Sequence, residues 1–348
     1  MTGGPLWLIS RGSRDSDLFS VILPWQDHLP QIAAPEECTP KNRSAVSEFV
    51  ILGLLNRPEM QPLLFTVFLC VYLVAVLGNG LIMAAVSLSA ALHTPMYVML
   101  LPLVLVDVVC TSSIVPKMLE TTLGPRKTIS YSGCMAQLLF FTWSLGAKMV
   151  LFTAMAFDGN VAICFLLHYA AVMSRRTCSA LLAAVLLVAV TNSWVHTVLV
   201  LRLTSCGSDA VDHFFCEIPA LLALSCSPVR ANEVMVFVAD VALAMGDFVL
   251  TCLSYSFIVA AILRIRSAEG KRKAFSICSS HLCVVSLYYS PVIYTYFRPA
   301  SSYSFDRDKV VAALYTLVTP TLNPIVYSLR NREIQAGIRK VFSSLKCR

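Results

Sequence analysis

Seven apolar stretches, most of them 20 residues or longer, limit what this chain can fold into. A helix of about 20 apolar residues crosses the ~30 Å hydrocarbon core of a bilayer, where no water satisfies exposed backbone groups. The sequence therefore predicts an all-α membrane protein, a seven-transmembrane helix bundle. The expected spans lie at about residues 62–87, 96–119, 134–164, 179–201, 234–263, 274–297 and 309–328.

The composition argues against a soluble domain. Charged residues make up 14% of the sequence and hydrophobic residues 57%, whereas soluble domains carry roughly 25% charged residues. The 13 cysteines fit a secretory-pathway protein with extracellular disulfides better than a cytosolic enzyme. We therefore expect a multi-pass protein of the plasma membrane.

The charges are distributed unevenly along the chain. The expected second and third inner loops and the tail hold 13 Lys and Arg residues against two acids, Glu269 and Glu333. This is the positive-inside bias of membrane proteins, and it does not indicate nucleic-acid binding. Because the number of spans is odd, we expect a cytoplasmic C-terminus and an extracellular N-terminus.

The end of the chain has a different periodicity. Within residues 329–348, apolar side chains recur at helical spacing among basic residues, at Ile334, Ile338, Val341, Phe342 and Leu345. This pattern predicts a short amphipathic helix on the inner leaflet, with membrane lipid as its partner.

Ionisable residues within the spans are the first candidates for function, because a charge in lipid is costly. Asp107 lies about 12 residues, or ~18 Å, into the second span. Lys148 lies ten residues, or ~15 Å, from Asp158 in the third span. These depths are similar, so we expect an ion pair between Asp107 and Lys148. The alternative is that Lys148 reaches an internal water cavity without a fixed partner.

Asparagines and two further acids also lie within the predicted spans. We expect Asn79 and Asn323 to join Asp107 and Lys148 in an intramembrane polar network. The fifth span carries Asp240 and Asp247, seven residues apart and therefore on one helix face. A transporter or channel is an alternative reading of these charges, but it predicts internal repeats, which the sequence does not display.

Five motifs occur in an order typical of one family. Residues 92–97 read LHTPMY, 155–169 MAFDGNVAICFLLHY, 254–258 SYSFI, 273–282 KAFSICSSHL and 320–331 PTLNPIVYSLRN. Over about residues 46–348 the chain resembles the olfactory receptors, rhodopsin-like class A G-protein-coupled receptors. The resemblance implies a receptor for small odorants that signals through a stimulatory G protein and adenylyl cyclase.

The inner end of the third span departs from the family pattern. Gly159 stands where the family has arginine, Asn160 where it has tyrosine, and Leu166 where it has proline. The resemblance assigns G-protein coupling to Asp158 and positions 159 and 160, supported by Tyr255 and Tyr327. We therefore expect weakened coupling. The alternative is a non-coupling protein that retains the receptor fold as a decoy, a dimer partner or the product of a decaying gene.

Disulfides are implied by the same resemblance. It pairs Cys134 with Cys216 and Cys206 with Cys226, forming a lid over the bundle. Two segments also resemble metal sites: His213, Cys216 and Glu217 in the lid, and Cys278, His281 and Cys283 in the sixth span. A disulfide would consume the Cys216 thiolate and the second set lacks a fourth ligand, so we expect no metal.

The ligand pocket is expected in the outer parts of the third, fifth, sixth and seventh spans. Phe141, Thr142 and Leu145 share a helix face, and the resemblance puts Tyr289 near the pocket floor. The remaining candidates are Asp240, Val292, Tyr296, Ala313 and Thr316. The alternative is that these side chains only pack the bundle.

The N-terminal segment says less about function than the spans do. The family usually begins near residue 38, so within the extracellular segment 1–61 the first 37 residues are an atypical extension. Asn42 begins an N-x-S sequon and is a candidate for glycosylation. The sequence presents no nucleophile–base pair and no phosphate loop, so we expect neither an enzyme nor a cofactor.

Overall fold

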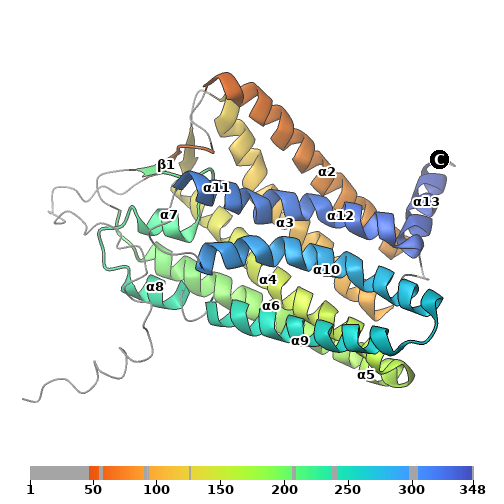
Figure 1. Cartoon of the computed structure of the whole chain (residues 1–348). Coiled ribbons are helices and arrows are strands. Elements are labelled where there is room, and N and C mark those ends of the chain that lie inside the picture. The colour runs from red at the N-terminus through yellow and green to blue at the C-terminus, as the bar shows by residue number, and fades with distance from the viewer. Residues whose placement is uncertain are drawn as a thin grey trace, which may run out of the picture.

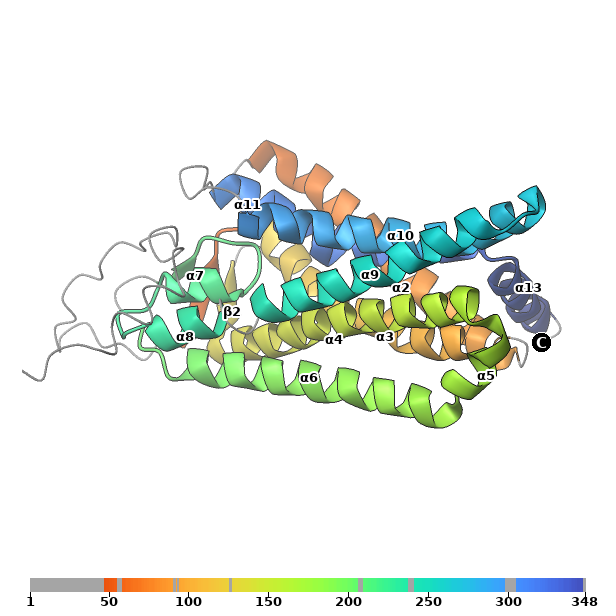
Figure 2. The ribbon, with the colours of Figure 1, turned by 60° about the horizontal axis from the view of Figure 1, so that its bottom comes forward.

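The computed structural model describes residues 47–54, 58–89, 92, 94–124, 127–205, 209–236, 241–297 and 305–346. Long helices lie side by side in one bundle (Figures 1 and 2). This mostly helical architecture confirms the predicted fold class. The predicted extension 1–37 and the sequon at Asn42 lie outside the described residues.

Six helices among the described residues are long and apolar enough to cross a membrane. Five are single helices, namely α2 (Gln61–Leu88), α3 (Pro95–Leu123), α4 (Tyr131–Cys164), α6 (Arg175–Leu201) and α9 (Ala242–Arg264). The sixth is the stretch Arg307–Ser328, which combines α11 (Phe305–Ala313) and α12 (Thr319–Arg330).

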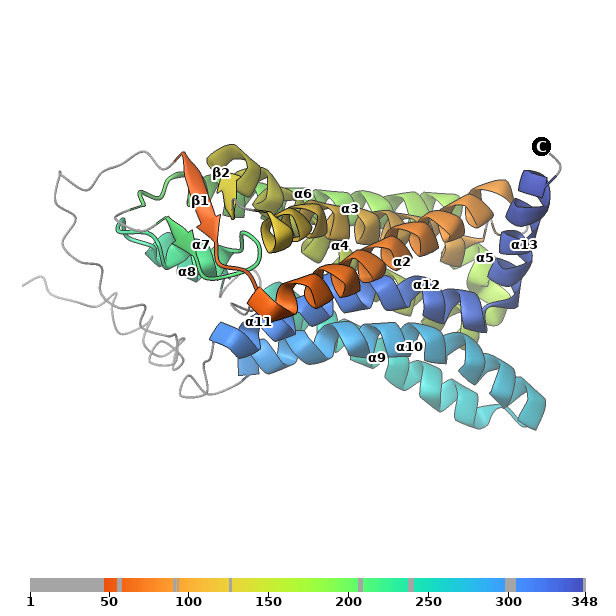
Figure 3. The same ribbon diagram turned by 90° about the horizontal axis from the view of Figure 1, so that it is seen from above.

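A seventh long helix, α10 (Ala268–Phe297), packs against α9 and α12. Its 30 residues are enough to cross a bilayer. It is less apolar than the five single helices because serine, histidine and tyrosine residues interrupt its apolar run. Its place beside α9 completes the arrangement that the seven apolar stretches predicted (Figure 3).

Two predicted spans are not single regular helices. The short helix α8 (Arg230–Met235) precedes α9, and residues 237–240 between them lie outside the described part of the chain. In the seventh span a π-helical turn, Leu314–Val318, joins α11 to α12. Pro320 follows this turn. Because proline has no backbone N–H, it cannot donate the hydrogen bond to the carbonyl four residues earlier that a regular α-helix would have there.

Helix α4 is the centre of the bundle and packs against α3, α6 and α9. It begins after Ser130, whose side chain accepts a 3.1 Å hydrogen bond from the Gly133 N–H and caps the helix. Its 34 residues extend about 51 Å. Its two ends therefore lie at opposite ends of the bundle.

A small sheet that the sequence did not predict closes the outer end. The strand β1 (Glu48–Ile51) lies between β2 (Thr128–Ser130), which is antiparallel to it, and β3 (Ala210–Val211), which is parallel. Phe49 and Ile51 on β1 are both buried. Three segments distant in the sequence are thereby tied together (Figure 3).

The predicted amphipathic helix is α13 (Arg332–Lys346), which lies across the inner end of the bundle (Figure 1). Ile334 is fully buried and Phe342 is exposed. Gly337 allows close approach, because a Cβ there would lie 3.0 Å from Leu92 Cδ1 and 3.2 Å from Ala85 Cβ. The remaining short elements are η3 (Pro58–Met60), η5 (Leu166–His168), α5 (Tyr169–Val172) and α7 (Ile218–Leu222).

Candidate functional site

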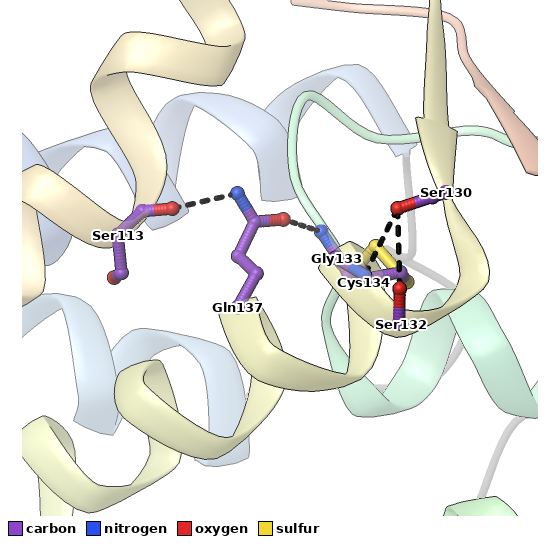
Figure 4. The surroundings of a disulfide bond; sticks show 7 residues. Ser113, Ser130, Ser132, Gly133, Cys134 and Gln137 are labelled. Carbon is purple, nitrogen blue, oxygen red and sulfur yellow. Dashed lines mark hydrogen bonds between the residues drawn. A yellow bond between two sulfur atoms is a disulfide. The ribbon is translucent and has the colours of Figure 1, made fainter.

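A disulfide fixes the segment between α6 and α8, the lid, to the outer end of α4. It joins Cys134 to Cys216. The Gln137 side chain lies beside it, accepting from the Cys216 backbone N–H over 2.8 Å and donating to the Ser113 carbonyl on α3 over 2.9 Å (Figure 4). One amide therefore satisfies backbone groups of both the lid and α3.

The second disulfide is only partly described. Cys226 is disulfide-bonded, whereas Cys206, its predicted partner, lies outside the described residues. Because the Cys216 sulfur is bonded to Cys134, it offers no thiolate to a metal beside His213 and Glu217. Among the described residues, no group of three or more His, Cys, Asp or Glu side chains is arranged to hold a metal ion.

The lid contains a buried acid–histidine contact. His213 Nε2 lies 3.3 Å from Glu217 Oε1. Burial, with Asp308 nearby, raises the pKa of Glu217 to about 8, and burial, with Lys309 nearby, lowers the pKa of His213 to about 3. Both groups are therefore neutral near pH 7. Lys309 also holds the lid to α11 through a 2.6 Å ion pair with Asp212.

Aromatic rings from the lid pack directly on the predicted pocket. Phe215 meets Phe141 edge to face, with ring centroids 4.8 Å apart. Tyr315 stacks on the same Phe141 at 6.5 Å. Phe214 and Phe215 are both buried in this cluster. The lid therefore covers an apolar region bounded by α3, α4 and the seventh span.

Several predicted pocket residues meet in this region. Leu145 and Ala313 are partly buried against the same cluster as Phe141. Thr316 is fully buried, and its hydroxyl donates to the Ala312 carbonyl of its own helix over 2.7 Å. Tyr289 is buried farther inward, in the main core that also contacts Leu145.

Thr142 lies away from this group. Its hydroxyl lies 3.0 Å from Ser193 Oγ on α6 and donates to the Leu138 carbonyl, so it packs the α4–α6 contact. The one-residue step from Phe141 turns Thr142 about 100° around the helix, which the sequence interpretation underestimated. Asp240 and the side chains of Val292 and Tyr296 lie outside what the structure describes.

A second polar cluster lies beside Tyr289. The Tyr289 hydroxyl donates to Asp247 Oδ2, and the Thr153 hydroxyl donates to Asp247 Oδ1. Thr251 Oγ1 lies 3.0 Å from Thr153 Oγ1. One carboxyl group on α9 thus bonds side chains of α4 and α10.

The polar network in the middle of the bundle surrounds Asp107. Lys148 Nζ lies 2.9 Å from Asp107 Oδ1, with both side chains fully buried. Asn323 Nδ2 donates to Asp107 Oδ2 over 2.5 Å. Asn79 donates instead to backbone carbonyls, of Ala75 over 2.8 Å and of Pro320 over 2.9 Å. The network therefore ties α2, α3 and α4 to α12.

At the inner end, Asp158 is bonded to the loop that follows α4. The Tyr169 hydroxyl donates to Asp158 Oδ1 over 2.9 Å. Burial and the Asp158 carboxylate raise the pKa of the Tyr169 hydroxyl, so it keeps its proton. The carboxylate that the family pairs with an adjacent arginine here has a tyrosine as its partner.

The three departures from the family pattern lie around this contact. A Cβ at Gly159 would meet only Ile258 Cδ1, at 3.7 Å, so the structure leaves room for a side chain. Asn160 Oδ1 is buried and has no hydrogen-bond partner among the described residues. Leu166 is 74% exposed and Leu167 95% exposed, so the loop presents apolar side chains outward.

The predicted supporting tyrosines have different environments. The Tyr255 hydroxyl bonds to His281 Nδ1, which joins α9 to α10. Tyr327 is buried, and within the described part of the chain its hydroxyl has no hydrogen-bond partner. Neither tyrosine bonds to Asp158 in this arrangement.

Comparison with known proteins identifies the family. The olfactory receptor sequence profile matches residues 68–345. Olfactory receptor 13G1 of Homo sapiens is 69% identical over 305 residues, which cover 88% of this chain and 99% of that protein. The chain belongs to the olfactory receptor family. Olfactory receptor 13A1 of Homo sapiens is 47% identical over 301 residues, covering 86% of this chain and 92% of that protein. Olfactory receptor 5AR1 of Mus musculus is 44% identical over 301 residues, covering 86% of this chain and 97% of that protein.

Family membership confirms the resemblance that the five sequence motifs indicated. This olfactory receptor is a multi-pass membrane protein of the G-protein-coupled class, and its general function is that of an odorant receptor. Its family consists of receptors, with odorants and G proteins as general partners.

Sequence reasoning missed Gln137 and Tyr169, and it gave Asp247 no role in the ligand site. Gln137 and Tyr169 are ordinary polar residues in apolar surroundings, and no spacing signals their partners. Asp247 was noted for its place on a helix face, but its bonds to Thr153 and Tyr289 join three different helices. Contacts of such long sequence separation are set by helix packing, which the pattern of one span does not determine.

Proposed function

We propose that this receptor binds small, mostly apolar odorants in the outer half of its bundle. Support comes from the apolar cluster beneath the disulfide-fixed lid, where Phe141 contacts both Phe215 and Tyr315. Small-molecule sites are mostly apolar, with few polar groups. The charge bias of the inner loops and the oxidising environment required by the lid disulfide both favour an extracellular lid and a cytoplasmic C-terminus.

We propose further that the receptor couples only weakly to a stimulatory G protein and adenylyl cyclase. Gly159 has no side chain to present to a G protein, and the neighbouring Asp158 is bonded to Tyr169 instead. Asn160 and Leu166 change the same loop. A non-coupling receptor-fold protein is the second candidate, favoured by the same glycine. It predicts silence even after Gly159→Arg.

Ligand binding tests the first part independently of coupling. The receptor in lipid nanodiscs is screened against a panel of apolar odorants by thermal unfolding, and the affinities of the stabilising odorants are measured. Phe141→Ala is expected to weaken binding at least tenfold, because it removes the buried ring in the pocket. Phe140→Ala is the matched control, since Phe140 precedes Phe141 on the same helix and is 50% exposed. Equal effects of the two variants would contradict the proposed pocket.

A further inference from the structure

Two acids within the helices, the fully buried Asp107 and the partly buried Asp247, differ in how their charges are balanced. Asp107 forms an ion pair with Lys148. Asp247 accepts hydroxyl groups on both carboxylate oxygens, and the ion pairs within the described residues do not include it. Within a predicted membrane span, a partly buried carboxylate without a countercharge is still costly, and a cation that joins it would remove that cost.

The surroundings of Asp247 have the composition of an ammonium site. The next residue, Phe248, packs against the Tyr289 ring at 5.4 Å between centroids. Tyr288 meets Tyr289 edge to face at 5.6 Å. Aromatic faces attract cations, most strongly when water is excluded. The carboxylate is therefore bonded to Tyr289, whose ring packs against two further aromatic rings.

This cluster is continuous with the proposed pocket. Leu145 packs against both the outer aromatic cluster around Phe141 and the core that contains Tyr289. The Tyr288 hydroxyl donates to the Leu145 carbonyl over 3.4 Å. An elongated ligand under the lid would thus point its inner end toward Tyr289 and Asp247.

We propose that Asp247 binds the protonated amine of a small apolar ligand at the floor of this pocket. The ammonium group donates to Oδ2 in place of the Tyr289 hydroxyl, while Thr153 holds Oδ1. The ligand's apolar body lies against Leu145 and Phe141. This inference rests on the proposed odorant pocket and adds the ligand class.

The test compares two ligands with one skeleton, cyclohexylmethylamine and cyclohexylmethanol, on the whole receptor in neutral-lipid nanodiscs at pH 7. We expect the amine to bind at least tenfold more tightly than the alcohol. Asp247→Asn keeps the shape of the side chain and removes its charge, so amine affinity should fall at least tenfold while alcohol affinity stays unchanged. Glu120→Gln, at an exposed acid on α3, should change neither and controls for general charge attraction.

Tyr289→Phe covers the case that Asp247→Asn does not fold. It keeps the carboxylate and removes the hydroxyl that competes for Oδ2, so amine affinity should equal or exceed that of the parent. Equal binding of amine and alcohol by the parent, or a tenfold loss of amine affinity in Tyr289→Phe, would overturn the amine site. If apolar odorants bind but amines have no advantage, the proposed pocket stands and this inference fails. If neither class binds, both fail.

Discussion

The Tyr169 hydroxyl donates to the Asp158 carboxylate over 2.9 Å, joining the inner end of α4 to the short helix α5. Asp158 is buried, and Gly159 beside it offers no charge. The hydrogen bond therefore takes over part of the stabilisation that an arginine would give. It also holds the second inner loop in one arrangement against the bundle.

Tyr169→Phe tests this contact. Removing the hydroxyl leaves a buried carboxylate without its donor, which costs about 1.5–3 kcal/mol for a charged hydrogen bond. We expect a clear drop in the thermal unfolding midpoint of the receptor in nanodiscs. Tyr131→Phe is the control, because the Tyr131 hydroxyl makes no hydrogen bond within the described residues and its ring packs on Phe49. A drop of the same size in both variants would mean that the contact with Asp158 contributes nothing specific.

The ion pair between Lys148 and Asp107 predicts a strongly non-additive pair of variants. Lys148→Met leaves a buried charge unpaired, and breaking such a pair costs about 3–5 kcal/mol. The double variant Lys148→Met with Asp107→Asn removes both charges and should recover most of that loss. Unfolding midpoints and the yield of folded receptor measure both effects. If the single and double variants are equally unstable, the pair is not coupled as its 2.9 Å contact implies.

Gly159 should accept alanine with a gain in stability. Glycine within a helix costs about 1 kcal/mol relative to alanine, and the new Cβ would meet only Ile258 Cδ1, at 3.7 Å. We expect Gly159→Ala to raise the unfolding midpoint. Gly78→Ala should lower it, because a Cβ there would lie 2.8 Å from Pro324 Cγ. A lower unfolding midpoint for Gly159→Ala than for Gly78→Ala would show that the space beside Gly159 does not hold a methyl group.

The lid should make stability depend on pH through Glu217. Its pKa is raised from 4.5 to about 8, so folding favours the protonated acid. That stabilisation is complete below pH 4.5 and is lost as the pH rises through about 8. We expect Glu217→Gln, which stays neutral, to gain stability progressively relative to the parent as the pH rises from 6.5 to about 8.

Two choices make this pH measurement specific. His213 has its pKa lowered from 6.5 to about 3, so its own contribution is lost as the pH falls below 6.5 and does not enter the window. Glu59→Gln, at an exposed acid, should leave the pH dependence of the parent unchanged. A pH-independent difference between the parent and Glu217→Gln would show that the acid is not buried in its neutral form.

Most of the helical fold could be predicted because each span satisfies its own backbone in lipid. The apolar lengths gave the helices, and the depths of Asp107 and Lys148 along adjacent spans gave their contact. The sheet of β1, β2 and β3 could not be predicted in this way, since its strands of two to four residues pair only after the bundle has formed.

The ligand site was harder to predict because it depends on side-chain direction. Helix spacing grouped Phe141, Thr142 and Leu145, but Phe141 and Leu145 pack in the cluster beneath the lid while Thr142 contacts α6. The lid rings Phe214 and Phe215 lie between His213 and Cys216 of the metal-like motif, and sequence reasoning assigned no role to them. Their packing on Phe141 depends on the Cys134–Cys216 disulfide and on the Gln137–Cys216 hydrogen bond, which join residues 82 and 79 positions apart.

Cyclic-AMP output tests the account of the inner end most directly. The receptor and its triple revertant, Gly159→Arg with Asn160→Tyr and Leu166→Pro, are expressed at matched surface levels and exposed to the same odorant panel. The account predicts a response from the revertant that exceeds that of the present sequence at least tenfold. Equal responses from the two proteins would contradict it, because coupling would then not require a side chain at position 159.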